Sequence, residues 1–226
     1  MKSKLVIIGA SYLQRPLVRR AMELGYDTHV FAWREGAVCR EIADHYYPIS
    51  VTDRAAILAE CRSIRPVGVV SIASEVAAAT VNYLASALGL PGNSRECSRL
   101  TGNKHSMRQA LLTAGVPGPA FQLASESVIQ DLPLRFPLIV KPVDRSGSRG
   151  VTLVEIPRAL PAAIVWAREQ SFCGDAIIEE YLEGRELSIE AVSFQGQHHV
   201  LQFTDKQTGG PPHFVEVAHH QPAALT

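Results

Sequence analysis

Short apolar runs alternate with amphipathic stretches from residue 4 to about residue 92. The apolar runs are short and β-branched, which is typical of buried strands, whereas the stretches between them have apolar positions at helical spacing. The predicted strands span residues 4–8, 27–33, 46–49 and 67–72. The predicted helices run from Pro16 to Gly25, from about Asp53 through Cys61, and over residues 75–88. Repeated alternation of this kind predicts an α/β fold with a doubly wound, mostly parallel sheet, in a Rossmann-like N-terminal domain.

The pattern changes after Asn93. Two helices are predicted over residues 94–100 and 104–114, and a β-rich unit with a single helix ending near Gln170 follows from residue 120. The predicted strands of this part span residues 137–141, 150–156, 176–181, 185–194, 198–204 and 213–218. We therefore expect an N-terminal domain over residues 1–92, a helical connection over 93–119 and an α+β unit beyond it.

Composition and charge argue against some classes of partner and of cellular compartment. The 22 basic residues balance 22 acidic ones, which argues against nucleic acid or an anionic membrane as the main partner. The first apolar run stops at Gly9, so a buried strand is preferred to a secretory signal, and no run of apolar residues is long enough to span a membrane. The four cysteines are scattered without a C-x-x-C pair, which indicates neither a disulfide framework nor a zinc site and suits a reducing, cytoplasmic location.

The strongest chemical signal is the segment from Lys141 to Val151, where a buried strand delivers a lysine into a loop of serine, glycine and arginine. Such a loop can turn successive backbone N–H groups toward one anion, and the lysine adds a positive charge, so phosphate binding is one interpretation. The other is an ordinary glycine-rich hairpin with a solvated lysine. The segment is not a P-loop, because a strand rather than a helix is predicted after it.

The N-terminal domain lacks the usual dinucleotide signature. Its first loop, residues 9–14, is not G-x-G-x-x-G, and no acid follows the second strand, so dinucleotide binding is disfavoured. Glu75 follows a predicted strand at the sheet edge where open α/β sheets bind ligands, with Gly9 and Ser11 expected in the same crevice. Glu75 could hold the ammonium of a substrate, or it could simply favour the start of its helix.

A second signal lies in residues 177–188, an apolar strand that runs into acids, a turn at Gly184 and a further acid. Free backbone groups in such a segment can bind adenine, and a carboxylate beyond the turn can accept hydrogen bonds from both ribose hydroxyls. A hairpin with exposed glutamates is the alternative interpretation.

Four motifs in this order resemble the ATP-grasp superfamily of carboxylate–amine ligases, which includes L-amino-acid ligases, D-alanine–D-alanine ligases and biotin carboxylase. They are Asn103-Lys104, Pro137–Pro142, the Ser146–Gly150 loop and Glu179–Glu186. The resemblance implies a pre-ATP-grasp domain over residues 1–92, an ATP-grasp small (lid) subdomain over 120–190, and the start of the large subdomain, incomplete, over 191–226.

The resemblance also implies roles for individual residues. Lys104 and Lys141 would contact the nucleotide phosphates, although Lys104 could instead be a surface lysine at a helix end. The main chain of Glu180 and Leu182 would read the adenine edge, Glu186 would bind the ribose, and Tyr181 would pack against the base. The ATP-binding residues expected in full are Lys104, Lys141, Ser146, Gly147, Ser148, Gly150, Glu179, Glu180, Tyr181, Leu182 and Glu186.

The C-terminal stretch is similar to the F-V-E-x-x-H-x-x-P segment of amino-acid-ligase-like members, which leads toward the acceptor site. Lys206, Glu216 and His219 are the substrate candidates there, beside Glu75 in the N-terminal domain. Five of the eight histidines lie between His198 and His220, which makes metal binding one interpretation. No spacing resembles a zinc motif, however, and we expect no metal ligands within this chain.

The reaction implied by the resemblance is ATP-dependent joining of a small-molecule carboxylate to an amine through an acylphosphate, with ATP and Mg²⁺ required. The acid strand and E-x-N-x-R-like segment that would hold Mg²⁺ are not found before Thr226, so the metal ligands are expected downstream and the chain is expected to be incomplete for catalysis. The alternative is a non-catalytic Rossmann-like nucleotide-binding or regulatory module. No catalytic residue is assigned, and the oligomeric state is left open, with a homodimer as one expectation.

Overall fold

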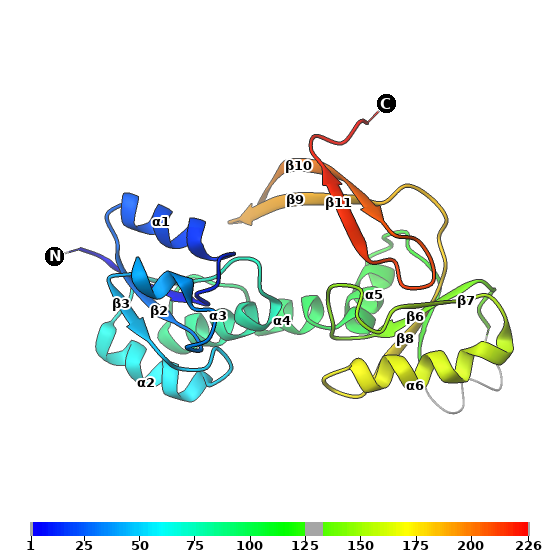
Figure 1. Cartoon of the computed structure of the whole chain (residues 1–226), viewed down its shortest axis with the longest axis horizontal. Coiled ribbons are helices and arrows are strands. Elements are labelled where there is room, and N and C mark those ends of the chain that lie inside the picture. The colour runs from blue at the N-terminus through cyan, green and yellow to red at the C-terminus, as the bar shows by residue number, and fades with distance from the viewer. Residues whose placement is uncertain (1, 125–132, 226) are drawn as a thin grey trace. The chain divides into compact units, whose positions relative to one another are not determined.

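The chain divides into two compact units, Met1–Gly102 and Asn103–Thr226 (Figure 1). The computed structural model describes residues 2–124 and 133–225. The first unit has one sheet and the second has two, and each unit has its own buried apolar cluster. The α/β fold predicted from the sequence is confirmed. No helix among the described residues is both long enough and apolar enough to cross a membrane.

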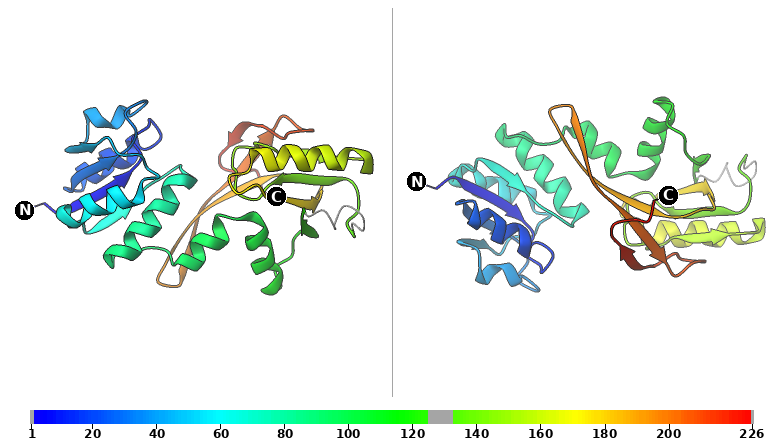
Figure 2. Two further views of the ribbon diagram at one scale, coloured as in Figure 1. Left: turned by 90° about the horizontal axis from the view of Figure 1, so that it is seen from below. Right: turned by 90° about the horizontal axis from the view of Figure 1, so that it is seen from above.

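The first unit is built around a parallel sheet in the order β3-β2-β1-β4. Helix α1 lies on one face and helices α2 and α3 on the other, as Figure 2 shows from two sides. Val6, Ile7 and Ile8 of β1 are fully buried because both faces of the strand are covered, which explains the continuous apolar run in the sequence. The strands are β1 (Lys4–Ile8), β2 (Asp27–Phe31), β3 (His45–Tyr47) and β4 (Gly68–Val70); the helices are α1 (Arg15–Glu23), α2 (Arg54–Ile64), α3 (Glu75–Leu88) and α4 (Arg95–Thr101), with a 3₁₀ turn, η1, at Val38–Glu41.

The second unit contains two antiparallel sheets. In the first, with the order β5-β8-β6-β7, helix α6 covers one face and packs on Leu138 and Val140 of β6. The second sheet has the order β11-β10-β9. The strands are β5 (Phe121–Leu123), β6 (Leu138–Pro142), β7 (Thr152–Val154), β8 (Ala176–Glu180), β9 (Leu187–Phe194), β10 (Gln197–Thr208) and β11 (Glu216–His220); the helices are α5 (Lys104–Thr113) and α6 (Leu160–Gln170), with a 3₁₀ turn, η2, at Pro157–Ala159.

Three elements depart most from the sequence-based expectation, and one of them, β10, runs on to Thr208 instead of ending at residue 204. Strand β5 was not predicted, because its three residues carry too little pattern to stand out. The last strand begins at Glu216 rather than His213, since residues 210–214 form a turn in which the Phe214 N–H bonds to the Gly210 carbonyl and Phe214 has a φ of 51°.

The helical connection divides between the units. Helix α4 packs against α3 in the first unit, where the Asn82 amide donates to the Ser98 hydroxyl over 2.8 Å. Helix α5 begins the second unit. The expected boundaries at residues 92, 119 and 190 stay predictions.

Candidate functional site

The end of β6 places Lys141 in an ion-paired cluster. Residues alternate along the strand, so Leu138 and Val140 face α6 while Lys141 points to the opposite face. Its Nζ lies 2.5 Å from the Oε2 of Glu179, which comes from the paired strand β8, and the Nε of Arg108 donates to Oε1 of the same carboxylate over 2.7 Å. Two cations against one anion leave a net positive charge at this strand end.

Glu179 is the buried centre of that cluster, with only 3% of its surface exposed. Burial alone would raise the pKa of its carboxyl, but the hydrogen bond from Arg108 and the charge of Lys141 outweigh burial and hold that pKa below its usual value. Both oxygens of the Glu179 carboxylate are therefore already paired with protein cations. Arg108 was not singled out from the sequence, although it lies one helical turn after Lys104 and so on the same helix face.

The start of α5 is fastened to the same strand end. The backbone N–H of Lys104 donates to the Val143 carbonyl over 2.7 Å, and its Nζ donates to the carbonyl of Arg145 over 2.5 Å. Asn103 caps the helix by accepting from the Ser106 N–H over 2.9 Å. Lys104 is thus anchored to the segment that follows Lys141 and leads into the glycine loop, so both lysines expected to contact phosphate lie at this strand end.

The loop over residues 146–150 adopts left-handed backbone at three positions. The φ angles of Gly147, Ser148 and Gly150 are 65°, 56° and 72°. Such angles turn neighbouring N–H groups toward a common side, which is how backbone nests bind anions. Ser148 is held there by its hydroxyl, which donates to the Phe214 carbonyl over 2.9 Å.

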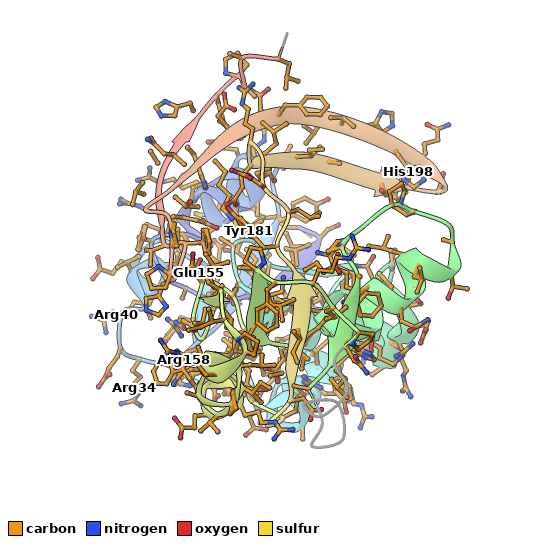
Figure 3. The ribbon with its side chains drawn as sticks, turned by 90° about the vertical axis from the view of Figure 1, so that its right-hand side faces the viewer. Arg34, Arg40, Glu155, Arg158, Tyr181 and His198 are labelled. Atoms are coloured by element: carbon orange, nitrogen blue, oxygen red, sulfur yellow. The ribbon has the colours of Figure 1, made fainter. Side chains whose placement is uncertain are left out.

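Strand β8 ends at the segment expected to bind adenine. The Tyr181 N–H donates to the Pro137 carbonyl over 3.0 Å, and its ring lies 5.8 Å from that of Phe214, between centroids. Tyr181 is labelled in Figure 3. The Glu180 carboxylate accepts from the Arg135 N–H over 3.0 Å. The next residue, Leu182, is exposed, and its N–H has no hydrogen-bond partner in the described part of the chain.

The structure joins Glu186 to the C-terminal candidates. The Nζ of Lys206 lies 3.3 Å from Glu186 and 2.9 Å from Glu216, and Glu216 in turn lies 3.6 Å from the ring of His219. Partial burial would lower the pKa of Lys206, but its bonds to the two carboxylates outweigh that effect and raise it, so the side chain stays charged. The strand register brings these side chains together, because Lys206 of β10 pairs with His219 of β11.

The first unit has a separate cavity of about 180 Å³ at the carboxyl ends of its strands. Gly9, Ser11 and Ser74 line it, in agreement with the crevice expected from the sequence. The side chain of Gln14 organises the wall by accepting from the Ser11 N–H and donating to the Ile72 carbonyl. Glu75 is exposed at the start of α3 and is not among the residues that line this cavity.

Residues 134–226 match the ATP-grasp domain family. The superfamily resemblance read from the four motifs is therefore confirmed, and the ATP-grasp match includes Lys141, the 146–150 loop, Glu179 and the C-terminal candidates.

Individual relatives agree with the ATP-grasp match. D-alanine–D-alanine ligase B of Mesorhizobium japonicum is 32% identical over 92 residues, which is 40% of this chain and 30% of that protein. The crystal structure of L-amino acid ligase from Bacillus licheniformis matches all of this chain and 56% of its own, with a TM-score of 0.81 and 24% identity. N5-carboxyaminoimidazole synthetase from Staphylococcus aureus, complexed with ADP, matches all of this chain and 60% of its own, with a TM-score of 0.81 and 17% identity. The structural matches show a shared fold, and the chain spans about a third of the first of these relatives and somewhat over half of the other two.

Proposed function

We propose that the second unit forms the ATP-binding part of an ATP-dependent carboxylate–amine ligase. The observation that carries this proposal is the convergence of Lys104, Lys141 and the left-handed 146–150 loop at one strand end, within the segment that matches the ATP-grasp family. ATP brings several anionic oxygens to one place, and lysines with aligned backbone N–H groups are the groups that offset such charge.

The proposed contacts with the adenine and the ribose come from the residues at and after the end of β8. The exposed N–H of Leu182 would donate to the adenine ring, with Tyr181 packed beside it and Glu180 supplying the neighbouring main-chain group. Glu186 would accept from the ribose hydroxyls. Since Glu186 pairs with Lys206 in this structure, ribose would compete with that ion pair, in which the Glu186 side chain is 45% exposed.

The network of Lys206, Glu216 and His219 would lie toward the carboxylate substrate. A lysine that stays charged can hold a carboxylate while its oxygen accepts the terminal phosphoryl group of ATP, giving the acylphosphate that an amine then attacks. Glu75 belongs to the first unit, and its contact with a substrate ammonium stays a prediction. Mg²⁺ would enter with ATP and neutralise part of the phosphate charge.

Equilibrium titration of the whole chain with MgATP and with NADPH tests the nucleotide proposal. We expect MgATP to bind and NADPH to give no comparable signal. Lys141→Ala should weaken MgATP binding roughly 10- to 100-fold, because a charged hydrogen bond to phosphate contributes about 1.5–3 kcal/mol. Lys2→Ala, which removes an equal charge from an exposed position, is the matched control and should leave the affinity unchanged.

Tight NADPH binding without a response to MgATP would overturn the proposal in favour of a Rossmann-like regulatory module. Equal MgATP affinities for the wild-type chain and for a folded Lys141→Ala variant would overturn the assignment of the site. Circular dichroism checks that the variant is folded, and Lys104→Ala provides a second probe of the same phosphate contacts.

A further inference from the structure

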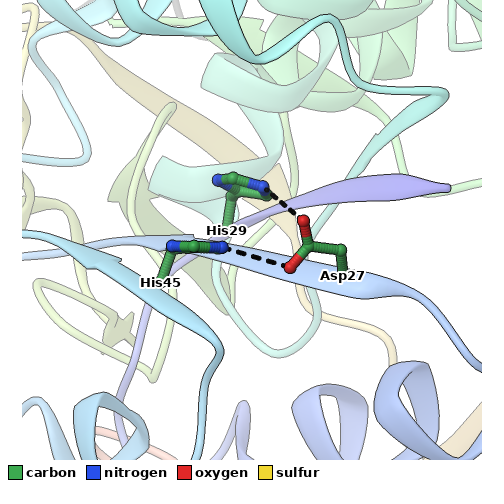
Figure 4. Close-up of side chains that lie close together, drawn as sticks. All are labelled: Asp27, His29 and His45. Carbon is green, nitrogen blue, oxygen red and sulfur yellow. Dashed lines mark ion pairs between the residues drawn. The ribbon is translucent and has the colours of Figure 1, made fainter. Parts of the chain in front are cut away.

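A group of three metal-ligating side chains lies in the first unit, away from the cavity of that unit. Asp27 and His29 are two residues apart on β2 and therefore face the same side of the sheet, and His45 on β3 is the register partner of His29. Figure 4 shows both imidazole rings directed at the Asp27 carboxylate. The group lies toward the amino ends of β2 and β3, whereas the cavity lies at the carboxyl ends of the strands.

The distances within the group suit a small cation. The Nε2 atom of His29 lies 3.4 Å from Oδ2 of Asp27, and the Nε2 atom of His45 lies 3.2 Å from Oδ1. One ligand atom from each of the three residues lies within 4.8 Å of the others. A tetrahedral zinc ion about 2.0–2.1 Å from its nitrogen and oxygen ligands separates them by about 3.3 Å, which matches the two nitrogen–oxygen distances.

One buried nitrogen of the group, Nε2 of His29, meets only the Asp27 carboxylate, at 3.4 Å. His29 is 4% exposed, and its Nε2 has no hydrogen bond to any described residue. Its other ring nitrogen, Nδ1, lies 2.9 Å from the Tyr47 hydroxyl. If Nδ1 carries the proton and donates it to Tyr47, Nε2 presents a lone pair to the Asp27 carboxylate, and two acceptors then face each other with nothing between them. A cation at that point satisfies both.

The surroundings of the group suit metal ligation. A neutral imidazole oriented by a hydrogen bond at its second nitrogen is the usual form of a metal-bound histidine. The side chain of His45 is 50% exposed, which leaves a path from solvent to the site.

We propose that Asp27, His29 and His45 bind a divalent transition-metal ion of the zinc type, with a fourth position open to solvent. Two imidazole nitrogens and one carboxylate oxygen form a ligand set that suits zinc and open catalytic-type sites, and Tyr47 positions His29 from outside the ligand shell. The two rings stack with an interplanar angle of 17°, so they tilt on binding until both nitrogen lone pairs point at the ion. This site is independent of the proposed nucleotide function.

The test is titration of the metal-free whole chain with Zn²⁺, followed by calorimetry, and with Co²⁺, followed by visible absorption. We expect one tight zinc site and the strong visible bands of low-symmetry, near-tetrahedral cobalt. His45→Gln and Asp27→Asn should each weaken zinc binding at least 10-fold and abolish the cobalt bands. Tyr47→Phe should weaken zinc binding roughly 10-fold by freeing the His29 ring, as loss of an orienting partner does in other sites.

His198→Gln is the matched control, because His198 is an exposed histidine at the tip of the β9–β10 hairpin, labelled in Figure 3. It should leave the site with its full zinc affinity. His45 is half-exposed, so its replacement is expected to preserve the fold, which thermal unfolding of the metal-free variants checks. Absence of a tight zinc site in the wild-type chain, unchanged zinc affinity in folded His45→Gln, or loss of the site in His198→Gln would overturn the proposal.

Discussion

At the residue scale, Glu179 constrains the candidate nucleotide site more than any other residue singled out from the sequence. Its carboxylate fixes the ammonium of Lys141 on one side and the guanidinium of Arg108 on the other. A lysine held in this way is already in place at the strand end, so binding phosphate costs less side-chain entropy than it would for a freely rotating lysine. Glu179 is thus a positioning residue in the proposed site.

Replacing Glu179 with glutamine should destabilise the second unit by about 3 kcal/mol, because it leaves two part-buried cations without their anion. Urea unfolding measures this effect. In a Trp33→Phe background, the remaining tryptophan is Trp166 on α6, which reports on the second unit. Glu183→Gln, an exposed neighbour, is the control and should change stability by less than about 0.5 kcal/mol. A Glu179→Gln loss no larger than that of the control would contradict the role given to this carboxylate.

The same carboxylate predicts how stability depends on pH. The pKa of Glu179 is lower in the folded chain than its ordinary value of 4.5, so the unfolded chain binds the proton more readily. The stabilisation from this group is therefore full above about pH 5 and is lost as the pH falls through the lowered folded pKa. Urea unfolding from pH 7 down to pH 3 should show a smaller acid-induced loss in Glu179→Gln than in the wild type. Identical pH profiles would show that Glu179 carries no such linkage.

Sequence reasoning reached the residues of this site more readily than their partners. Lys141 and the loop after it are adjacent in sequence, so a local pattern reveals them. The pairing of Lys141 with Glu179 depends on the antiparallel register of β6 and β8, and the contribution of Arg108 depends on where α5 packs. These contacts arise from tertiary structure, and no local spacing encodes them.

At the element scale, the 146–150 loop owes its conformation to two glycines with different constraints. Both have positive φ, but a Cβ on Gly147 would meet nothing within 4 Å, whereas a Cβ on Gly150 would lie 2.8 Å from Pro142 and 2.9 Å from Gln170. Gly150 is thus required by packing as well as by backbone angle, and Gly147 by backbone angle alone.

Alanine at the two glycines should separate these effects. Gly147→Ala should cost about 1 kcal/mol for the left-handed backbone, and Gly150→Ala about 3 kcal/mol because steric overlap adds to the same strain. Urea unfolding followed by Trp166 fluorescence measures both. Equal losses for the two variants would contradict this distinction.

The elements themselves were predictable where the pattern was long or well capped. Helix α3 was placed correctly over residues 75–88, and in the structure Ser74 and Gly89 cap its two ends. Short pieces were harder. The three residues of β5 form a strand because they pair with the edge of β8. Strand β11 starts later than predicted because a turn precedes it, and the alternation of apolar and polar residues does not reveal that turn.

At the scale of the whole molecule, the candidate sites are distributed over two units with separate cores. The first contains the cavity around Ser11 and Ser74 and the Asp27–His29–His45 group. The second contains Lys104, Lys141, the 146–150 loop and the network around Lys206. The central claim is that the nucleotide binds through the second unit, although the Rossmann-like sheet in the first is the more familiar nucleotide-binding architecture.

Hydrogen–deuterium exchange of the whole chain with and without MgATP tests that claim most directly, because it locates the ligand on the sequence. We predict slower exchange in peptides covering residues 141–150 and 177–186, where loop and strand-end amides would contact the nucleotide, and unchanged exchange over residues 9–14 of the first unit. Protection confined to residues 9–14, with none over residues 141–150, would contradict the account.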